Sequence, residues 1–235
     1  MTEIKDEGGF TVMGVDAWQE RWKKRSIGFH NTDVHPMLKK HADAMINNRK
    51  NIRIFFPMCG KSIDMKWLGD QGHTIIGVEC AEMALQEFFE ENGLEYTTEP
   101  VEEINGKVLK SQDGRYILYC CDIYMFTKEL EGQFSGIWDR GAFVAINRHD
   151  RSKYSTMMKT LMAPDCHYLL DTLDYNEKLY AGPPHYVPVE QIYSLFGDIC
   201  NIEEVDIMDA LEQKHKDWGL DYFNDRIHLL TLKNS

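Results

Sequence analysis

A short turn after the first apolar run of the chain carries residues that could bind a nucleoside. The turn reads Pro57-Met58-Cys59-Gly60-Lys61-Ser62 and follows a β-rich run at residues 52–56. Its single glycine lets the backbone approach a ligand closely. The next β-branched run ends at Glu79, and an acidic residue about 20 positions after such a turn is placed to accept both hydroxyls of an adenosine ribose.

The same residues also have a purely structural interpretation. Gly60 can be an ordinary turn residue, and Glu79 can stabilise the start of the following helix through the helix dipole. A dinucleotide site would need the pattern G-x-G-x-x-G, of which only one glycine is present. Gly60-Lys61-Ser62 resembles the end of a phosphate-binding loop, but the first glycine of that pattern is replaced by Phe55 inside the apolar run. NAD, FAD and a phosphate nest are therefore disfavoured.

A cofactor with a sulfonium cation needs neither a pyrophosphate cradle nor a lysine. Carbonyl dipoles and aromatic faces suit such a charge. S-Adenosylmethionine thus fits a turn with one glycine, and we expect it as the cofactor.

Other chemistries find little support in the sequence. The six cysteines show no C-x-x-C spacing and the nine histidines are scattered, which predicts buried free thiols and no bound metal. No Ser/His/Asp arrangement is convincing, because Asp139 is connected to His149 or His167 only through neighbouring predicted strands. A hydrolase is therefore a weak interpretation.

Composition narrows the class of protein further. The chain has 235 residues, 43% hydrophobic and 27% charged, with a formal net charge of -12, as expected for one packed α/β domain. No dense Lys/Arg cluster offsets this charge, so nucleic acid and anionic membranes are unlikely partners. We find neither a secretory signal at the start nor a run of about 20 apolar residues, and we expect a cytoplasmic protein.

The elements that must position the site alternate between strand and helix. Residues 1–15 are polar and aperiodic, which predicts a flexible tail, and Asp16 can cap a first helix. A second helix is expected after Pro36. Strands are expected at 52–56, 73–78, 116–121, 134–138, 167–173, 199–205 and 226–232, with a hairpin partner at 108–110, and helices near 62–70, 81–92, 150–162 and 189–196. This alternation predicts a doubly wound α/β fold with a mostly parallel sheet and helices on both faces.

Several segments resemble one family in their order along the chain. They are Phe55-Phe56-Pro57-Met58-Cys59-Gly60-Lys61-Ser62 with Met65-Lys66-Trp67, Gly77-Val78-Glu79, Leu118-Tyr119-Cys120-Cys121, Ile137-Trp138-Asp139-Arg140-Gly141-Ala142, Gly182-Pro183-Pro184 and Trp218-Gly219-Leu220-Asp221. Over about residues 16–233 the chain resembles the thiopurine S-methyltransferase family.

The resemblance implies a fold and an activity. The fold is the class I S-adenosylmethionine-dependent methyltransferase type with a seven-stranded sheet, in one domain over 16–235 with a helical lid at about 16–50. The activity is methyl transfer to the sulfur of small aromatic or heterocyclic thiols such as thiopurines, by a monomer. Positioning dominates such a reaction and no base is obligatory.

The resemblance also implies residue roles. The implied cofactor residues are Trp18, Trp22, Phe29, Met58, Cys59, Gly60, Glu79, Asp122, Ile123 and Arg140. Phe29, Arg140 and Lys214 are the implied substrate residues, with Arg140 assisting the reaction. Two positions depart from the family pattern, since Asp122 stands where serine is usual and Lys214 where the pattern has arginine.

Alternatives stay open at this stage. Trp18 and Trp22 could be core anchors of a docked helix, Arg140 a structural salt-bridge arginine, and Asp122 a loop cap. The methyl acceptor could be a halide, a selenium species or another thiol. A protein that binds the cofactor without turnover is a further possibility.

Overall fold

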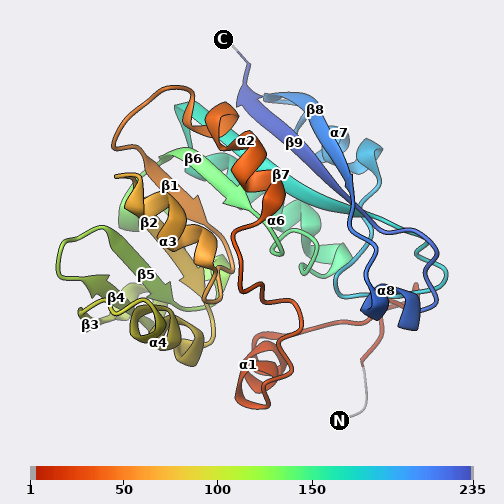
Figure 1. The fold of residues 1–235 in the computed structure, drawn as a ribbon, viewed down its shortest axis with the longest axis horizontal. Helices are drawn as coiled ribbons and strands as arrows, with labels where there is room; N and C mark the ends of the chain where they lie inside the picture. The colour runs from red at the N-terminus through yellow and green to blue at the C-terminus, as the bar shows by residue number, and fades with distance from the viewer. Residues whose placement is uncertain (1–3, 234–235) are drawn as a thin grey trace.

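The chain folds around one mixed β-sheet (Figure 1). The computed structural model describes residues 4–233. The strands are β1 (Arg53–Phe56), β2 (Thr74–Glu79), β3 (Tyr96–Val101), β4 (Gly106–Ser111), β5 (Tyr116–Cys120), β6 (Phe134–Asp139), β7 (Met162–Asp174), β8 (Cys200–Asp209) and β9 (Asn224–Leu232). The helices are α1 (Val15–Lys23), α2 (Pro36–Ile46), α3 (Ile63–Asp70), α4 (Glu82–Glu91), α5 (Lys128–Glu131), α6 (Arg151–Leu161), α7 (Val189–Phe196) and α8 (Gln213–Asp217), with 3₁₀ turns η1 (Glu102–Ile104), η2 (Ile123–Met125) and η3 (Arg148–Asp150).

The sheet follows the order β3-β4-β5-β2-β1-β6-β7-β9-β8. The five central strands, β5 to β7 in this order, pair in parallel, and both margins are antiparallel. The chain leaves β1 toward β2 on one side and returns through β6 on the other. Ligands bind at such a switch point, beyond the carboxyl ends of the strands. The doubly wound α/β prediction is therefore confirmed.

Nine strands form this sheet, where seven were expected. The predicted pairing of residues 108–110 with β5 is confirmed, from Lys107 opposite Cys120 to Lys110 opposite Ile117. The missed strand is β3, an edge strand whose four central residues are all exposed. It lacks apolar alternation and contains Pro100, which an edge strand tolerates. Without β3 and β4, seven strands remain.

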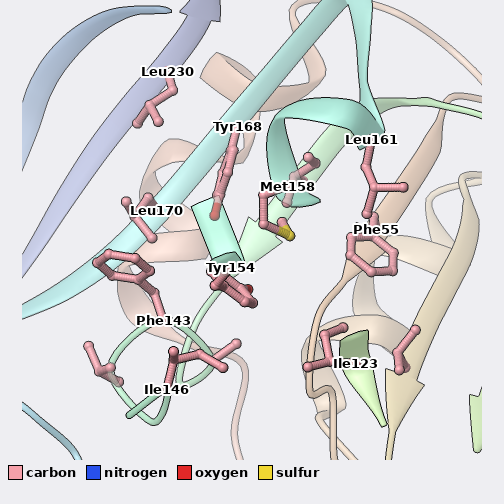
Figure 2. Close-up of a cluster of buried hydrophobic side chains, with 14 of the residues drawn as sticks. Phe55, Ile123, Phe143, Ile146, Tyr154, Met158, Leu161, Tyr168, Leu170 and Leu230 are labelled. Atoms are coloured by element: carbon pink, nitrogen blue, oxygen red, sulfur yellow. The ribbon is translucent and has the colours of Figure 1, made fainter. Parts of the chain in front are cut away.

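The hydrophobic core lies on both faces of the sheet. Along β1, Ile54 and Phe56 pack on the face covered by α2, α3 and α4, whereas Phe55 packs on the opposite face. Tyr154 and Met158 of α6 belong to that second core, shown in Figure 2. Successive strand residues point to opposite faces, so an apolar run without alternation marks a strand that is buried on both sides.

The segment before the first helix makes contacts with the domain. The N-cap of α1 is Gly14, and Asp16 lies in the first turn without capping it, because the helix begins two residues earlier than a cap at Asp16 implies. The side chain of Asn147 accepts a hydrogen bond from the Met13 N–H at 2.8 Å and donates one to the Met13 carbonyl at 3.1 Å. Flexibility of residues 1–15 stays a prediction, and residues 1–3 lie outside the described part.

Two further observations concern the chain as a whole. All six cysteines have free thiols, as the spacing predicted. Four are buried as expected, but Cys80 and Cys120 are only partly buried, because they lie at the carboxyl ends of β2 and β5. Among the helices of residues 4–233, none is long and apolar enough to cross a membrane.

Candidate active site

A large cavity of about 920 Å³ lies at the carboxyl ends of the central strands. Its wall is formed by residues from several segments. They are residues 18–29, which we call the predicted lid, the turn after β1, the ends of β2, β5 and β6, and the segment around α8. Figure 1 shows α1 beyond the arrowhead of β1. Every candidate residue from the sequence lines this cavity: Trp18, Trp22, Phe29, Met58, Cys59, Gly60, Glu79, Asp122, Ile123, Arg140 and Lys214.

Glu79 joins two loops of the site through its carboxylate. One oxygen, Oε2, accepts a hydrogen bond from the Gly60 N–H at 3.0 Å, and Oε1 accepts one from the Ala81 N–H at 2.9 Å. The side chain is buried, which raises its pKa, while these backbone donors act in the opposite direction. Oε1 also accepts from Sγ of Cys80 at 3.2 Å. A carboxylate oxygen has two lone pairs, so Oε2 can accept another hydrogen bond directly, and Oε1 can do so when the weak thiol donor turns away. The structural role and the ribose role of Glu79 are therefore compatible.

Gly60 is required by its conformation and by its neighbour. Its φ is +51°, in the left-handed region that favours glycine, and an added Cβ would lie 3.0 Å from Cζ2 of Trp22. Met58, two residues earlier, has a φ of +43°. Such positive φ values in residues other than glycine cluster at ligand sites. The turn thus brings bare backbone against an aromatic ring of the lid.

Three aromatic side chains of the lid form one group. The ring of Phe29 meets Trp18 edge-on at a centroid distance of 5.8 Å and Trp22 at 5.7 Å. Trp22 is 2% exposed and packs with Ala81 and Ala84. It therefore anchors α1 to the domain, in agreement with the alternative interpretation, and also lines the cavity. Trp18 is half-buried and faces the same cavity.

Hydrogen bonds hold the lid against the rest of the site. Arg140 donates from Nη1 to the carbonyl of Phe29 at 2.8 Å, and Gln19 donates from Nε2 to the carbonyl of Cys80 at 2.9 Å. Within residues 4–233, Arg140 forms no ion pair at salt-bridge distance, so the salt-bridge alternative has no support there. Arg140 thus connects the end of β6 to the lid.

Asp122 follows β5 and caps η2. Its Oδ1 accepts a hydrogen bond from the Tyr124 N–H at 3.0 Å, so the loop-cap alternative describes this oxygen. The neighbouring Ile123 is buried in the hydrophobic core and also lines the cavity. The Asp122 carbonyl accepts from the Met125 N–H at 2.9 Å, whereas the second carboxylate oxygen makes no hydrogen bond within residues 4–233.

Lys214 lies on α8 at the opposite side of the cavity. Its Nζ is 2.8 Å from Oε2 of Glu212, and its side chain is 43% exposed. This contact lowers the pKa of Glu212. The cation expected on the acceptor side is therefore present, but it is shared with a carboxylate that the sequence did not indicate.

A buried polar cluster in the same cavity was missed by sequence reasoning. Nε2 of His35 lies 3.3 Å from Oδ2 of Asp225 and 3.9 Å from Oδ2 of Asp171. All three residues line the cavity, and their ligand atoms are close enough to hold a metal ion. The absence of a resident metal stays a prediction. The signal was Asp171 itself, a carboxylate inside the apolar run at 167–173.

The buried Asp139 bonds to tyrosines and not to either histidine considered for a triad. Its Oδ2 accepts hydrogen bonds from the hydroxyls of Tyr154 at 2.7 Å and Tyr168 at 2.6 Å. Nδ1 of His167 lies 2.6 Å from the Ala44 carbonyl instead. The carboxylate therefore has a structural role in the core under the site.

The fold and the position of this cavity define the class. The structure of a S-adenosylmethionine-dependent methyltransferase from Anabaena variabilis superimposes with a TM-score of 0.64 at 15% identity, over 99% of each chain. This chain therefore has the fold of such methyltransferases.

Sequence comparison gives the family. The family model for thiopurine S-methyltransferase matches residues 13–233. A probable thiopurine S-methyltransferase from Danio rerio is 49% identical over 223 residues, which are 94% of this chain and 96% of that protein. The thiopurine S-methyltransferase of Canis lupus familiaris is 46% identical over 94% of this chain and 91% of its own length. The chain belongs to the thiopurine S-methyltransferase family.

Proposed function

We propose that this protein transfers the methyl group of S-adenosylmethionine to the sulfur of small aromatic or heterocyclic thiols such as thiopurines. One observation carries the proposal. A single cavity brings together the buried carboxylate of Glu79, the backbone of Gly60, an aromatic lid and the guanidinium of Arg140. The first three suit a nucleoside with a cationic sulfur, and the last suits an electron-rich acceptor.

The residues present fit the cofactor. Oε2 of Glu79 keeps a lone pair for a ribose hydroxyl, and a second hydroxyl can replace the weak Cys80 thiol donor on Oε1. Gly60 leaves a space that a Cβ would fill against Trp22. The faces of the lid rings can stabilise a sulfonium cation. Ile123 offers an apolar surface to the adenine ring, beside the backbone of Asp122.

The chain acts mainly by positioning. S-Adenosylmethionine, when bound, supplies a methyl group that its sulfonium already activates. The lid of Trp18 and Phe29 covers the cavity and excludes water, and Arg140 holds the lid backbone at Phe29. Correct orientation of two reactants can contribute about 7 to 11 kcal/mol. The protein therefore needs no obligatory general base for an acceptor that is already partly ionised.

The residues proposed to bind the methyl acceptor include one aromatic ring and two cations. The ring of Phe29 offers a surface for a flat heterocycle. The cations of Arg140 and Lys214 stabilise the partial negative charge on sulfur before methyl transfer. Since Lys214 is a compact charge paired with Glu212, it recognises planar groups less specifically than arginine does.

Methyl transfer from labelled S-adenosylmethionine tests the proposal. The protein is incubated with a panel of aromatic thiols, thiopurines, halides, selenium species and amines, and products are identified by mass. Labelled S-methyl products are expected for the thiols, and Glu79→Ala should lose them. Glu82→Ala is the matched control, because Glu82 lies on α4 and contacts the exposed Lys107.

Other outcomes separate the alternatives. Transfer to halide or selenium acceptors without transfer to thiols would reassign the acceptor. Binding of the cofactor without transfer to any acceptor would indicate a non-catalytic protein. A cytoplasmic location and a monomeric state stay predictions, and sedimentation of the purified protein tests the second.

A further inference from the structure

The cavity contains a polar region that the proposed mechanism does not use. Asp171 of β7, Asp225 of β9 and His35 before α2 meet at the carboxyl edge of the sheet. Asp171 and His35 are 5% and 4% exposed. These residues come from three distant segments, and all three line the cavity. We call them the His35-Asp171-Asp225 cluster.

The cluster has hydrogen-bonding capacity that the protein does not satisfy. Oδ1 of Asp171 and Nδ1 of His35 are buried without a hydrogen-bond partner among the described residues. The nearby Asp64 is different, since it accepts from the His35 N–H at 2.8 Å and from Nε1 of Trp138 at 2.9 Å. A buried unpaired carboxylate oxygen is unfavourable. Oδ1 of Asp171 can therefore accept a hydrogen bond from a donor group of a bound ligand.

The charges around the cluster favour one kind of ligand. The negative charges of Asp225 and Asp64 disfavour the ionisation of Asp171. The positive charge of Arg140 favours it. Three carboxylates, Asp225, Asp139 and Asp64, thus act on Asp171 against one guanidinium, that of Arg140. A divalent metal would suit the carboxylates but would be repelled by Arg140. A neutral N–H donor satisfies Asp171 without that repulsion.

We propose that the His35-Asp171-Asp225 cluster is a subsite for a ring N–H of the methyl acceptor, with Asp171 as its hydrogen-bond acceptor. The inference rests on the proposed function, because it places the acceptor beside Arg140 in the same cavity. It narrows the acceptor class to thiols and thiones on nitrogen heterocycles. A plain thiophenol has no group to place there.

A matched pair of probes tests the subsite. Pyridine-2-thione and thiophenol have similar size, but only the first carries a ring N–H next to the sulfur. Calorimetry measures the affinity of each for the complex of the full protein with S-adenosylhomocysteine. Wild type should bind pyridine-2-thione more tightly. Asp171→Leu should weaken that binding by about tenfold or more, as for loss of a buried hydrogen bond, and change thiophenol binding by less than about threefold.

Two further variants keep the test sharp. Asp171→Asn retains a carbonyl acceptor of nearly the same shape, so its preference should lie between those of wild type and the leucine variant. Asp221→Asn removes an exposed carboxylate and should match wild type. Thermal unfolding and affinity for S-adenosylhomocysteine confirm that each variant is folded.

The results distinguish this inference from the proposed function. Equal preference in wild type and Asp171→Leu, or no preference in wild type, would overturn the subsite even if thiols are methylated. A preference that depends on Asp171 without methyl transfer would leave the subsite in place and remove the proposed reaction. Stabilisation of wild type, but not of Asp171→Leu, by added Mn²⁺ or Zn²⁺ would identify a metal site instead.

Discussion

The carboxylate of Glu79 accepts a hydrogen bond from the backbone N–H of Gly60 at 3.0 Å. This contact joins the turn after β1 to the end of β2, two loops that meet only because their strands are parallel neighbours. The same carboxylate accepts from Ala81 at the start of α4. Glu79 thereby fixes the shape of the proposed cofactor site before any ligand binds.

Removal of this carboxylate should weaken cofactor binding strongly. Two hydrogen bonds to ribose hydroxyls contribute about 1.5 to 3 kcal/mol each, so Glu79→Ala should bind S-adenosylhomocysteine at least about a hundredfold more weakly. Calorimetry checks this, with Glu82→Ala as control. Affinity within about twofold of wild type in a folded Glu79 variant would exclude Glu79 as the ribose ligand.

A methyl group at Gly60 should disturb the lid as well as the turn. Gly60→Ala combines a positive φ with a Cβ 3.0 Å from Trp22. Gly93 has a φ of +62° with nothing within 4 Å of an added Cβ, so Gly93→Ala isolates the conformational cost of about 1 to 2 kcal/mol. Denaturant unfolding should show a loss in both variants. Weaker cofactor binding is expected only for Gly60→Ala, and equal binding by the two variants would contradict it.

The lid should change its protection when cofactor binds. Residues 18–29 contribute Trp18, Trp22 and Phe29 to the cavity wall, and a lid formed by them must open to exchange product for fresh cofactor. Hydrogen exchange by mass spectrometry should show faster exchange of their amides in the free protein than in the S-adenosylhomocysteine complex. Amides of α7, which lies outside both the predicted lid and the cavity wall, serve as an internal reference. Equal protection in both states would leave Trp18 and Trp22 as packing residues only.

Lys214 should act on the acceptor and leave the cofactor alone. Lys214→Arg should raise kcat/KM for a thiopurine relative to thiophenol, because arginine offers a planar fork. Lys214→Met should lower both values, by a few-fold given the 43% exposed side chain. Lys216→Met is the control, an exposed lysine of the same helix. Identical selectivity in wild type, Arg and Met proteins would place Lys214 outside the acceptor site.

The pH dependence of stability should report the buried Asp171. Burial first, and then the charge of Asp225, raise the pKa of Asp171 in the folded protein, while Arg140 lowers it. The folded state therefore keeps a proton that the unfolded chain loses above about pH 4. Stability from this group is present at low pH and is lost as pH rises toward the folded pKa.

Asp171→Asn should remove the loss of folding stability that the ionisation of Asp171 causes as pH rises. The free energy of unfolding of the variant, relative to wild type, should increase as pH rises above about 4, where the unfolded chain loses its proton and the folded protein keeps it. Urea unfolding of the cofactor-free proteins measures it. His35, Asp64, Asp139, Asp225 and Arg140 titrate or carry charge nearby and are common to both proteins. Parallel pH profiles would show that Asp171 ionises in the folded state as it does in the unfolded chain.

Local patterns were sufficient for much of this protein. The apolar run of β1, the turn at Gly60 and the acid at Glu79 are near one another in sequence and follow directly from strand and turn chemistry. The motif resemblance added the lid and Arg140. Gly60, Glu79, Arg140 and the aromatic residues of the predicted lid line one cavity in the structure.

Two features, the edge strand β3 and the His35-Asp171-Asp225 cluster, depend on tertiary contacts that local sequence patterns do not encode. β3 is an edge strand held by pairing with β4, so its exposed residues carry no apolar period. His35, Asp171 and Asp225 meet because α2 packs on the face of β7 and because β7 pairs with β9. Their separation along the chain hides their proximity. The sequence by itself determined the fold class and the cofactor-binding residues. The tertiary structure decided the His35-Asp171-Asp225 cluster, since only packing brings distant polar groups together.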